Sequence, residues 1–202
     1  MRAVIQRVTS AAVDVGGARV GSIGPGVLVL VGCADGDTAK EVDWLSRKIL
    51  STRVWPDPAT GKPWSVSVAN DASKSVLLVS QFTLFGSVRK GTRPDFGGAM
   101  PGPAAQALFD GLVERVKATV EPESRVATGV FGAMMEVSEE GRLMRVRGRL
   151  RAWGGGGSFF LAHVVLHFFL AHVLLPSQVH LVNDGPVTLM LDSHTLGPRS
   201  DG

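Results

Sequence analysis

The sequence predicts an α+β fold, a mainly antiparallel β-sheet with two flanking helices. Three observations predict the sheet and helices: alternating strand-like segments at the start, two amphipathic helical stretches, and glycine-punctuated apolar runs near the end. Strands that pair locally around two helices favour α+β over a doubly wound sheet. A chain of 202 residues with 45% hydrophobic content is most simply one domain, residues 1–202.

The first third of the chain predicts three strands. Apolar and polar residues alternate from Ala3 to Val8, and residues 11–15 continue the pattern to a turn at Gly16 and Gly17. A second turn over residues 21–26 leads to the apolar strand Val27–Val31. We therefore expect a hairpin followed by a buried strand.

Two helices are predicted from residues recurring at helical spacing. The first begins after the capping residue Thr38 and runs to Leu50, and the second begins at about Ala104, after two prolines. Their apolar stripes are Val42, Leu45, Ile49 and Leu50 in the first helix, and Ala107, Leu108, Leu112, Val116 and Val120 in the second.

The remaining strands are short. We expect strands at 53–55 and 65–68, an apolar strand over Val76–Leu84, and two further strands over 126–137 and 181–192. The strand at 76–84 delivers the polar segment Ser80-Gln81-Phe82-Thr83.

The net charge of +3 is not evidence for RNA binding. Five of the 21 basic residues and two of the 18 acidic residues lie in 138–178, which leaves 16 of each in the rest of the chain. Any contact with nucleic acid must therefore come from a local patch.

A cytoplasmic protein is expected. The single cysteine, Cys33, excludes an intramolecular disulfide and follows an apolar strand, which favours a buried thiol over a nucleophile. The first seven residues carry charges where a signal peptide needs its apolar stretch. No cofactor, metal, DNA or membrane partner is expected.

Residues 138–178 form an insert of unusual composition. It joins an arginine-rich stretch, four glycines at 154–157, and the apolar run Phe159–Leu175, in which a six-residue motif returns after nine residues. A membrane span needs about 20 apolar residues, whereas this run has 17 including three histidines. A metal site through His163, His167 and His172 lacks a carboxylate or thiolate nearby, so that signal is weak.

Reverse translation offers a third interpretation of the insert. Val137-Ser138 can be encoded by a splice-donor sequence, the Phe, Leu, Ser and Pro codons by a pyrimidine tract, and Gln178 by an acceptor end. Removal of Val137–Gln178 would join Glu136 to Val179. We take a retained intron as the hypothesis, with a lineage-specific surface loop as the alternative, since the cost of loop closure grows slowly with length.

A Gly-Pro step inside a strand-like run is the most informative local feature. Gly185-Pro186 lies within Asn183–Ser193, and proline can neither donate to a sheet ladder nor keep the usual strong trans preference. Such a step presents backbone carbonyls as a rigid probe without a side chain. The segment Ser80–Thr83 offers hydroxyls, an amide and backbone N–H groups at another strand end.

The sequence resembles the D-aminoacyl-tRNA deacylases over nearly its whole length, 138–178 excepted. The segments that carry the resemblance are Ala3–Thr9, Ser80–Leu84, Arg93–Phe96, Thr128–Met134 and Asn183–Thr188. The pair Ser-Gln-Phe-Thr and Asn-x-Gly-Pro-Val-Thr is specific to this family. The resemblance implies a strongly curved, barrel-like sheet with two flanking helices, assembled as a homodimer. It also implies hydrolysis of D-aminoacyl-tRNA and, secondarily, of glycyl-tRNA.

The resemblance also implies roles for the two motifs. Ser80, Gln81, Phe82 and Thr83 form the catalytic segment, and the 2′-hydroxyl of the terminal adenosine of the tRNA takes part in the reaction. The bond matching Gly185-Pro186 is cis in the family and reaches into the partner subunit's pocket. Its carbonyls capture the substrate amino group, and an L-side chain is excluded sterically.

Further site residues are expected around these motifs. Arg7 is the candidate for fixing the Gly-Pro loop, against an ordinary solvated arginine. Phe131, Gly132, Ala133 and Met134 line the adenine pocket or else pack in the core. The cluster Arg89, Lys90 and Arg93 contacts tRNA phosphates or is a solvated loop.

Catalysis by positioning and electrostatics fits the residue types best. A nucleophilic Ser80 or Thr83 needs a base, and outside the insert only His180 and His194 remain. We expect backbone N–H groups near Gln81 and Phe82 to stabilise the oxyanion formed as water attacks the ester. The alternatives are a small-ester hydrolase acting through Thr83, a tRNA-binding module without turnover, and an isoform inactivated by its insert.

Overall fold

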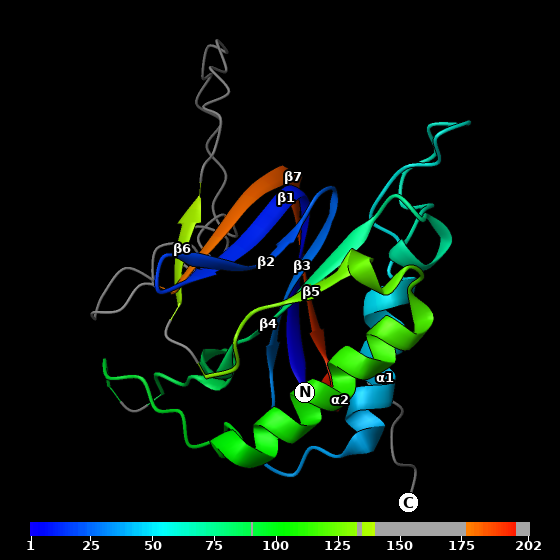
Figure 1. Ribbon diagram of the computed structural model, residues 1–202. Coiled ribbons are helices and arrows are strands. Elements are labelled where there is room, and N and C mark those ends of the chain that lie inside the picture. Colours follow the sequence, from blue (N-terminus) through cyan, green and yellow to red (C-terminus); the bar gives the residue numbers. More distant parts are fainter. Residues whose placement is uncertain (90, 133–134, 140–176, 197–202) are drawn as a thin grey trace, which may run out of the picture.

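The computed structural model describes residues 1–89, 91–132, 135–139 and 177–196, and it shows a barrel-like sheet with helices against it (Figure 1). The side chains of 135–139, 177 and 196 are outside this description. The strands are β1 (Arg2–Val15), β2 (Ala18–Ile23), β3 (Gly26–Gly32), β4 (Ser75–Ser80), β5 (Val126–Thr128), β6 (Met135–Glu139) and β7 (Ser177–Asp192). The helices are α1 (Ala39–Ser51), α2 (Gly102–Thr119), the short α4 (Ser193–Leu196) and three 3₁₀ turns, η1 (Val68–Asn70), η2 (Phe82–Phe85) and η3 (Glu123–Arg125).

The predicted α+β class is confirmed, with a mixed sheet. Its order is β5-β4-β3-β1-β7-β6, and β2 pairs with β1. β1 is antiparallel to β2, β3 and β7, while β3–β4, β4–β5 and β6–β7 are parallel. The β3–β4 and β4–β5 pairs are parallel because α1 and α2 each carry the chain back to the end of the sheet where the preceding strand began.

Two apolar clusters fill the two faces of the sheet. On one face α1 and α2 lie side by side and bury Leu45, Ile49 and Leu112 against the strands (Figure 1). The other face buries Leu28, Leu77 and other residues within the curve of the sheet itself. Curvature therefore replaces a second layer of helices.

Close backbone approach makes the curvature possible where β2 meets β5. A Cβ at Gly21 would lie 2.5 Å from the backbone oxygen of Thr128. Only a residue without a side chain fits there, because real Cβ atoms do not approach a carbonyl so closely. The barrel-like closure predicted from sequence thus depends on this contact between strands that are not neighbours in the sheet.

The helix predictions agree with the structure to within two residues at most boundaries. Thr38 caps α1 in a reciprocal capping box with Glu41, as the sequence pattern predicts. The prediction of a strand through Leu84 was wrong: β4 ends at Ser80, and the chain turns into η2. Gln81 leaves the sheet at φ −148° and ψ 84°, which starts the turn.

Candidate active site

The Ser80–Thr83 segment lies at the carboxyl end of β4, where the chain leaves the sheet. Ser80 is still paired with Val31 of β3, and the Gln81 N–H donates to the Val31 carbonyl at 2.6 Å. The sequence predicted free N–H groups near both Gln81 and Phe82. The Gln81 N–H is already used by the sheet, whereas no described residue accepts a hydrogen bond from the Phe82 N–H.

Gly32 lets this turn lie directly on β3. A Cβ at Gly32 would lie 2.9 Å from the Gln81 carbonyl oxygen and 3.2 Å from the Leu84 Cβ. The sequence showed Gly32 only as the end of a strand, so its part in the site was not predicted. A glycine immediately after a buried apolar run is the signal that could have found it.

Thr83 has a hydrogen-bond donor beside it rather than a base. The Gln81 side-chain amide donates to the Thr83 hydroxyl oxygen at 2.5 Å. The described histidines each pair with a carboxylate elsewhere: His180 with Asp14 at 3.1 Å and His194 with Asp37 at 3.0 Å. This arrangement gives Thr83 no acceptor for its proton and so does not favour a nucleophilic threonine.

Gly185 and Pro186 form an exposed bulge on β7. Between its pairing with Gln6 and its pairing with Val8, β1 advances two residues while β7 runs through five, from Thr188 to Asn183. The extra residues cannot stay in the ladder and project from the sheet. Gly185 makes the turn with φ +71°, a conformation that favours glycine.

The Gly185–Pro186 peptide is trans, contrary to the cis state that the family resemblance implied. Among the described residues the cis peptide is Glu121–Pro122. The change of direction at the bulge is made by the left-handed Gly185 and the additional β7 residues, so it does not need a cis bond here.

Arg7 lies under this bulge. Its Nε donates to the Asp184 carbonyl at 2.9 Å and lies 3.1 Å from the Asp184 carboxylate, and a terminal nitrogen donates to the Val54 carbonyl. A Cβ on Gly185 would lie 3.4 Å from that guanidinium group. The side chain is 17% exposed, so it is not an ordinary solvated strand arginine.

Within one protomer the two motifs are far apart. Ser80 is level with Val31, Val31 with Ala3, and Ala3 with Leu191, so three strand spacings separate Ser80 from β7. Gly185 lies six residues further along β7. With strands about 4.8 Å apart and a rise of about 3.3 Å per residue, the separation is on the order of 20 Å.

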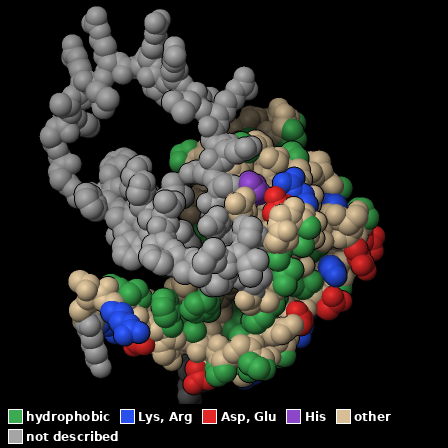
Figure 2. Space-filling model, turned by 60° about the vertical axis from the view of Figure 1, so that its left-hand side comes forward, with side chains coloured by type: hydrophobic (Ala, Val, Ile, Leu, Met, Phe, Trp, Pro, Cys, Tyr) green, Lys and Arg blue, Asp and Glu red, His purple; other side chains and the backbone are tan. Residues whose placement is uncertain are grey.

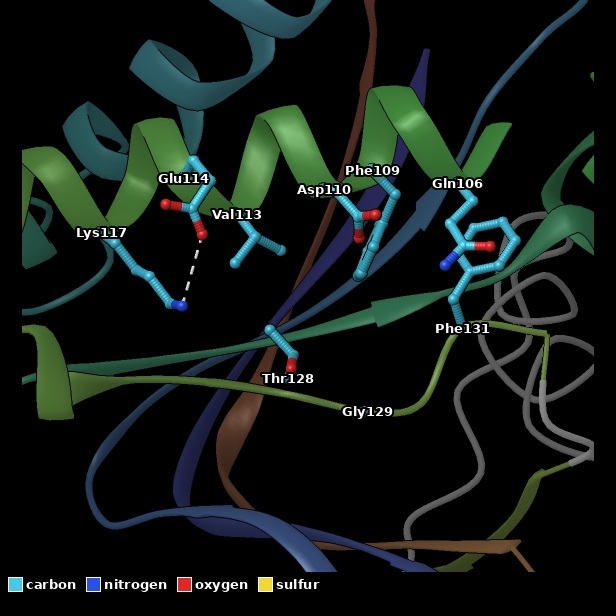
Figure 3. A pocket seen from close by; sticks show the side chains of 9 residues that line it. All are labelled: Gln106, Phe109, Asp110, Val113, Glu114, Lys117, Thr128, Gly129 and Phe131. Carbon is cyan, nitrogen blue, oxygen red and sulfur yellow. Dashed lines mark hydrogen bonds and ion pairs between the residues drawn. The ribbon is translucent and has the colours of Figure 1, made fainter. Parts of the chain in front are cut away.

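Phe131 lies between the core and a shallow cavity. Its ring is 5.8 Å from that of Phe109 on α2, and Gly132 follows it in a left-handed conformation. A cavity of about 290 Å³ lies between α2 and the end of β5, and Gln106 and Phe131 both line it (Figure 3). None of Ser80–Thr83 lines it. Ala133 and Met134, the rest of the predicted adenine pocket, lie outside the described residues.

The predicted basic cluster lies on a loop beside the turn. Ser87 and Asp95 exchange two backbone hydrogen bonds, each 2.8 Å, and close a loop that carries the exposed Arg89 and Arg93. Lys90 lies outside the described residues. The exposed Phe96, directly after this loop, packs edge-on against the exposed Phe82 with ring centroids 5.2 Å apart. The sequence did not predict that contact.

Two chemical classes find no support in the described part of the chain. Burial raises the pKa of the Cys33 thiol to about 11, with Asp37 adding to the shift, so the thiol is protonated at neutral pH. Among the described residues, no group of histidine, cysteine, aspartate and glutamate side chains could hold a metal ion. No described helix is long and apolar enough to cross a membrane.

Comparison with known proteins extends the resemblance seen in the sequence. The family model of D-Tyr-tRNA(Tyr) deacylase matches residues 4–141. The D-aminoacyl-tRNA deacylase of Syntrophobacter fumaroxidans is 38% identical over 96% of this chain and 97% of its own length. The human D-aminoacyl-tRNA deacylase 1 is 38% identical over 98% of this chain and 72% of its own length.

Solved structures agree with these matches. A protein described as c-Myc DNA unwinding element binding protein superposes with a TM-score of 0.70 at 37% identity, covering 96% of this chain and 99% of its own. A probable eukaryotic D-amino acid tRNA deacylase, 21% identical over 66% of this chain and 89% of its own, shares the fold with a TM-score of 0.57. The chain belongs to the D-Tyr-tRNA(Tyr) deacylase family.

Proposed function

We propose that this protein hydrolyses the ester bond of D-aminoacyl-tRNA in the cytosol and releases the free D-amino acid and the tRNA. The observation that carries the proposal is that both family motifs are built as distinct backbone features. One is a turn that packs on β3 and whose Phe82 N–H has no acceptor among the described residues, and the other is a projecting Gly185-Pro186 bulge held by Arg7. Glycyl-tRNA is a secondary substrate, since glycine has no side chain to exclude.

In this mechanism water attacks the ester carbonyl carbon and the carbonyl oxygen takes the negative charge. The Phe82 N–H donates to that oxyanion, and collapse of the intermediate breaks the bond to the ribose oxygen, which leaves with a proton. The 2′-hydroxyl of the terminal adenosine assists the proton transfer, so no protein base is required. Such oriented donors act mainly by electrostatic stabilisation of the transition state.

Chiral selection requires a second copy of the chain. The bulge lies on the order of 20 Å from Ser80 within one protomer, so Gly185-Pro186 would serve the partner's turn. Leu189 and Met190 on β7 are 36% and 68% exposed, and no described strand pairs with β7 beyond Leu181 on its outer side. In Figure 2 hydrophobic side chains are scattered over the coloured part of the face drawn, and most acidic side chains lie along its right-hand border. A homodimer would cover this apolar strand edge.

The acceptor end of the tRNA would approach from the side of the loop carrying Arg89, Lys90 and Arg93. Contacts with phosphates position the substrate without reading its sequence. Phe131–Met134 would receive the terminal adenine, next to the turn because Gly129 pairs with Leu78 of β4.

The insert is proposed to be a retained intron, and the strand register supports this. β6 runs parallel to β7 with Met135 opposite Ser177 and Glu136 opposite Gln178, a constant offset of 42 residues. Removal of residues 137–178 would therefore place Met135 and Glu136 where Ser177 and Gln178 now pair with Val15 and Asp14 of β1. β7 would keep its length and its register on β1, and β6 would no longer be a separate strand.

The coding DNA tests the intron directly. Codons for Val137-Ser138 that do not form GTNAGN would contradict it. So would transcripts that never lack this 126-nucleotide segment, the coding length of residues 137–178.

A chiral hydrolysis assay tests the function. The 202-residue chain and a chain lacking 137–178 would each be incubated with D-tyrosyl-tRNA and L-tyrosyl-tRNA, and ester loss followed with time. Rapid loss of the D-ester alone supports the proposal. Binding of both tRNAs without hydrolysis by either chain would indicate a tRNA-binding module instead. Activity of the shorter chain alone would mean that the insert inactivates the longer form.

A further inference from the structure

Arg2, at the start of β1, connects the catalytic turn to the end of β7. Its Nε donates to the Asp192 carboxylate at 2.7 Å, and a terminal nitrogen donates to the Leu84 carbonyl at 3.1 Å. The guanidinium carbon also lies 4.6 Å from the centre of the Phe85 ring, over its face. One side chain thus contacts both Leu84 and Phe85 of η2.

The turn has few other connections to the sheet. Of the hydrogen bonds made by the described residues 81–86, Leu84 N to Gln81 O and Gly86 N to Thr83 O lie within the turn. Gln81 N to Val31 O anchors its beginning, and Arg2 to Leu84 O anchors its end. Arg2 therefore fixes the half of the turn that follows Thr83.

Asp192, the other partner of Arg2, is buried and makes a second hydrogen bond. Asp192 is 6% exposed, accepts a hydrogen bond from the His194 N–H at 3.0 Å, and ends β7. Burial alone would raise the pKa of Asp192, but the hydrogen bonds from Arg2 and from the His194 N–H hold it below its usual value. The carboxylate stays charged at neutral pH and keeps the fork of Arg2 oriented.

We propose that Arg2 is a positioning residue for the hydrolysis. Its side chain is oriented by the Asp192 carboxylate, and it fixes the turn that carries Phe82 and Thr83 by contacting the Leu84 carbonyl and the Phe85 ring. The inference rests on the proposed function of this turn. Small displacements of an oriented donor cost much of its benefit, because the donor must meet the charge that develops in the transition state.

Three variants separate positioning from general stability. Arg2→Met removes the donors and keeps much of the aliphatic stem, and Arg2→Lys keeps a cation near Asp192 and the Phe85 ring. Arg19→Met is the matched control, since Arg19 makes a similar paired contact with Asp14, at 2.8 and 3.1 Å, on the distal β1–β2 hairpin. Each would be assayed for kcat and KM on D-tyrosyl-tRNA, thermal unfolding, and amide hydrogen exchange over residues 81–86.

We expect Arg2→Met to lower kcat about 10- to 100-fold with KM changed less than about threefold. Exchange of the Leu84 and Gly86 amides should become about tenfold faster. Arg2→Lys should fall between wild type and Arg2→Met, with kcat about 3- to 10-fold below wild type, since it keeps a cation near Asp192 but loses the fork that also reaches the Leu84 carbonyl. Arg19→Met should leave kcat and the exchange of residues 81–86 unchanged, because exposed ion pairs contribute little.

Unchanged exchange at Leu84 and Gly86 in Arg2→Met would overturn the inference, whatever the activity. Equal losses of kcat in Arg2→Met and Arg19→Met would overturn it too, since the effect would then be one of overall stability. Failure of the wild-type protein to hydrolyse the D-ester would instead count against the proposed function, and the exchange measurement would still decide the role of Arg2.

Discussion

The turn at residues 80–85, proposed to be catalytic, and the Gly185-Pro186 bulge are anchored in different ways. Residues 80–85 lie against β3 and are held at both ends, by Val31 and by Arg2. Gly185 and Pro186 are exposed and project from β7, with Arg7 beneath them. The turn is held at both ends by residues of the same protomer, whereas the bulge projects from the sheet with Arg7 beneath it. In the proposed homodimer, the turn of one copy and the projecting bulge of the other would form one site.

The largest expected effect comes from moving the turn at residues 80–85 away from β3. Gly32→Ala places a Cβ 2.9 Å from the Gln81 carbonyl, so the turn must move away from β3. We expect kcat for D-tyrosyl-tRNA to fall about 100-fold, because the Phe82 N–H no longer meets the oxyanion. The discrimination against L-tyrosyl-tRNA should change much less.

Gly24→Ala is the control for that experiment, since a Cβ at Gly24 meets nothing within 4 Å. Its kcat should equal the wild-type value. A Gly32→Ala protein with wild-type kcat would show that the packing of the turn on Gly32 does not set the geometry of the turn.

The next largest effect should come from removing the contacts that hold the Gly185-Pro186 bulge. Arg7→Met removes the donors that hold the Asp184 carbonyl and carboxylate. A hydrogen bond to a charged group is worth about 1.5–3 kcal/mol, so the ratio of D- to L-ester hydrolysis should fall about tenfold or more. The ratio of kcat/KM values for the two esters measures this directly.

Arg53→Met serves as the control for Arg7, because Arg53 is exposed and lies next to Val54, whose carbonyl Arg7 contacts. Its D-to-L ratio should not change. If Arg7→Met lost activity on both esters equally, the bulge would be acting in catalysis and not in chiral selection.

A smaller effect is expected at Thr83. Thr83→Ala removes a hydroxyl that accepts from Gln81 and has no base beside it. We expect kcat within about threefold of wild type, whereas loss of a true nucleophile costs a factor of about 10³ or more. A loss of that size, together with a burst of product in the wild-type protein, would support the rival acyl-enzyme mechanism through Thr83.

The last prediction concerns the pH dependence of stability at Cys33, which directly follows Gly32, the glycine beneath the turn. Its pKa is raised to about 11 from an ordinary value of 9.0, chiefly by burial. Above pH 9 the unfolded thiol loses its proton while the folded one keeps it, so stability falls as pH rises towards 11. A rise of about two pKa units is worth about 2–3 kcal/mol, so the Tm of wild type should fall by about 5–10 °C more than that of Cys33→Ala over this interval.

Thermal unfolding of both proteins at several pH values between 7 and 11 measures that difference, and other titrating groups cancel in it. The native thiol should also react with a disulfide reagent at least about 100-fold more slowly than in denaturant. Fast labelling of the native protein would mean that the end of β3 opens and does not hold the turn in one position.

Much of the fold and the identity of the motifs follow from the sequence alone. Alternation in the first strand, the capping box at Thr38 and the apolar stripes of α1 and α2 are local patterns, so local physics reveals them. The family assignment likewise rests on short contiguous motifs. The end of β4 at Ser80 was missed because an apolar run does not show where a chain leaves its sheet.

Only the tertiary structure decided which residues hold the motifs in place. Arg2, Gly32 and Asp192 lie far apart in sequence, and their contacts with the turn depend on strand order and register. The same is true of Arg7 under Gly185 and of the distance between the two motifs. A sequence determines the local conformation that each segment prefers. Which side chains contact the bulge on β7 or the glycine at the end of β3 depends on the strand order of the folded sheet, because those side chains come from distant parts of the chain.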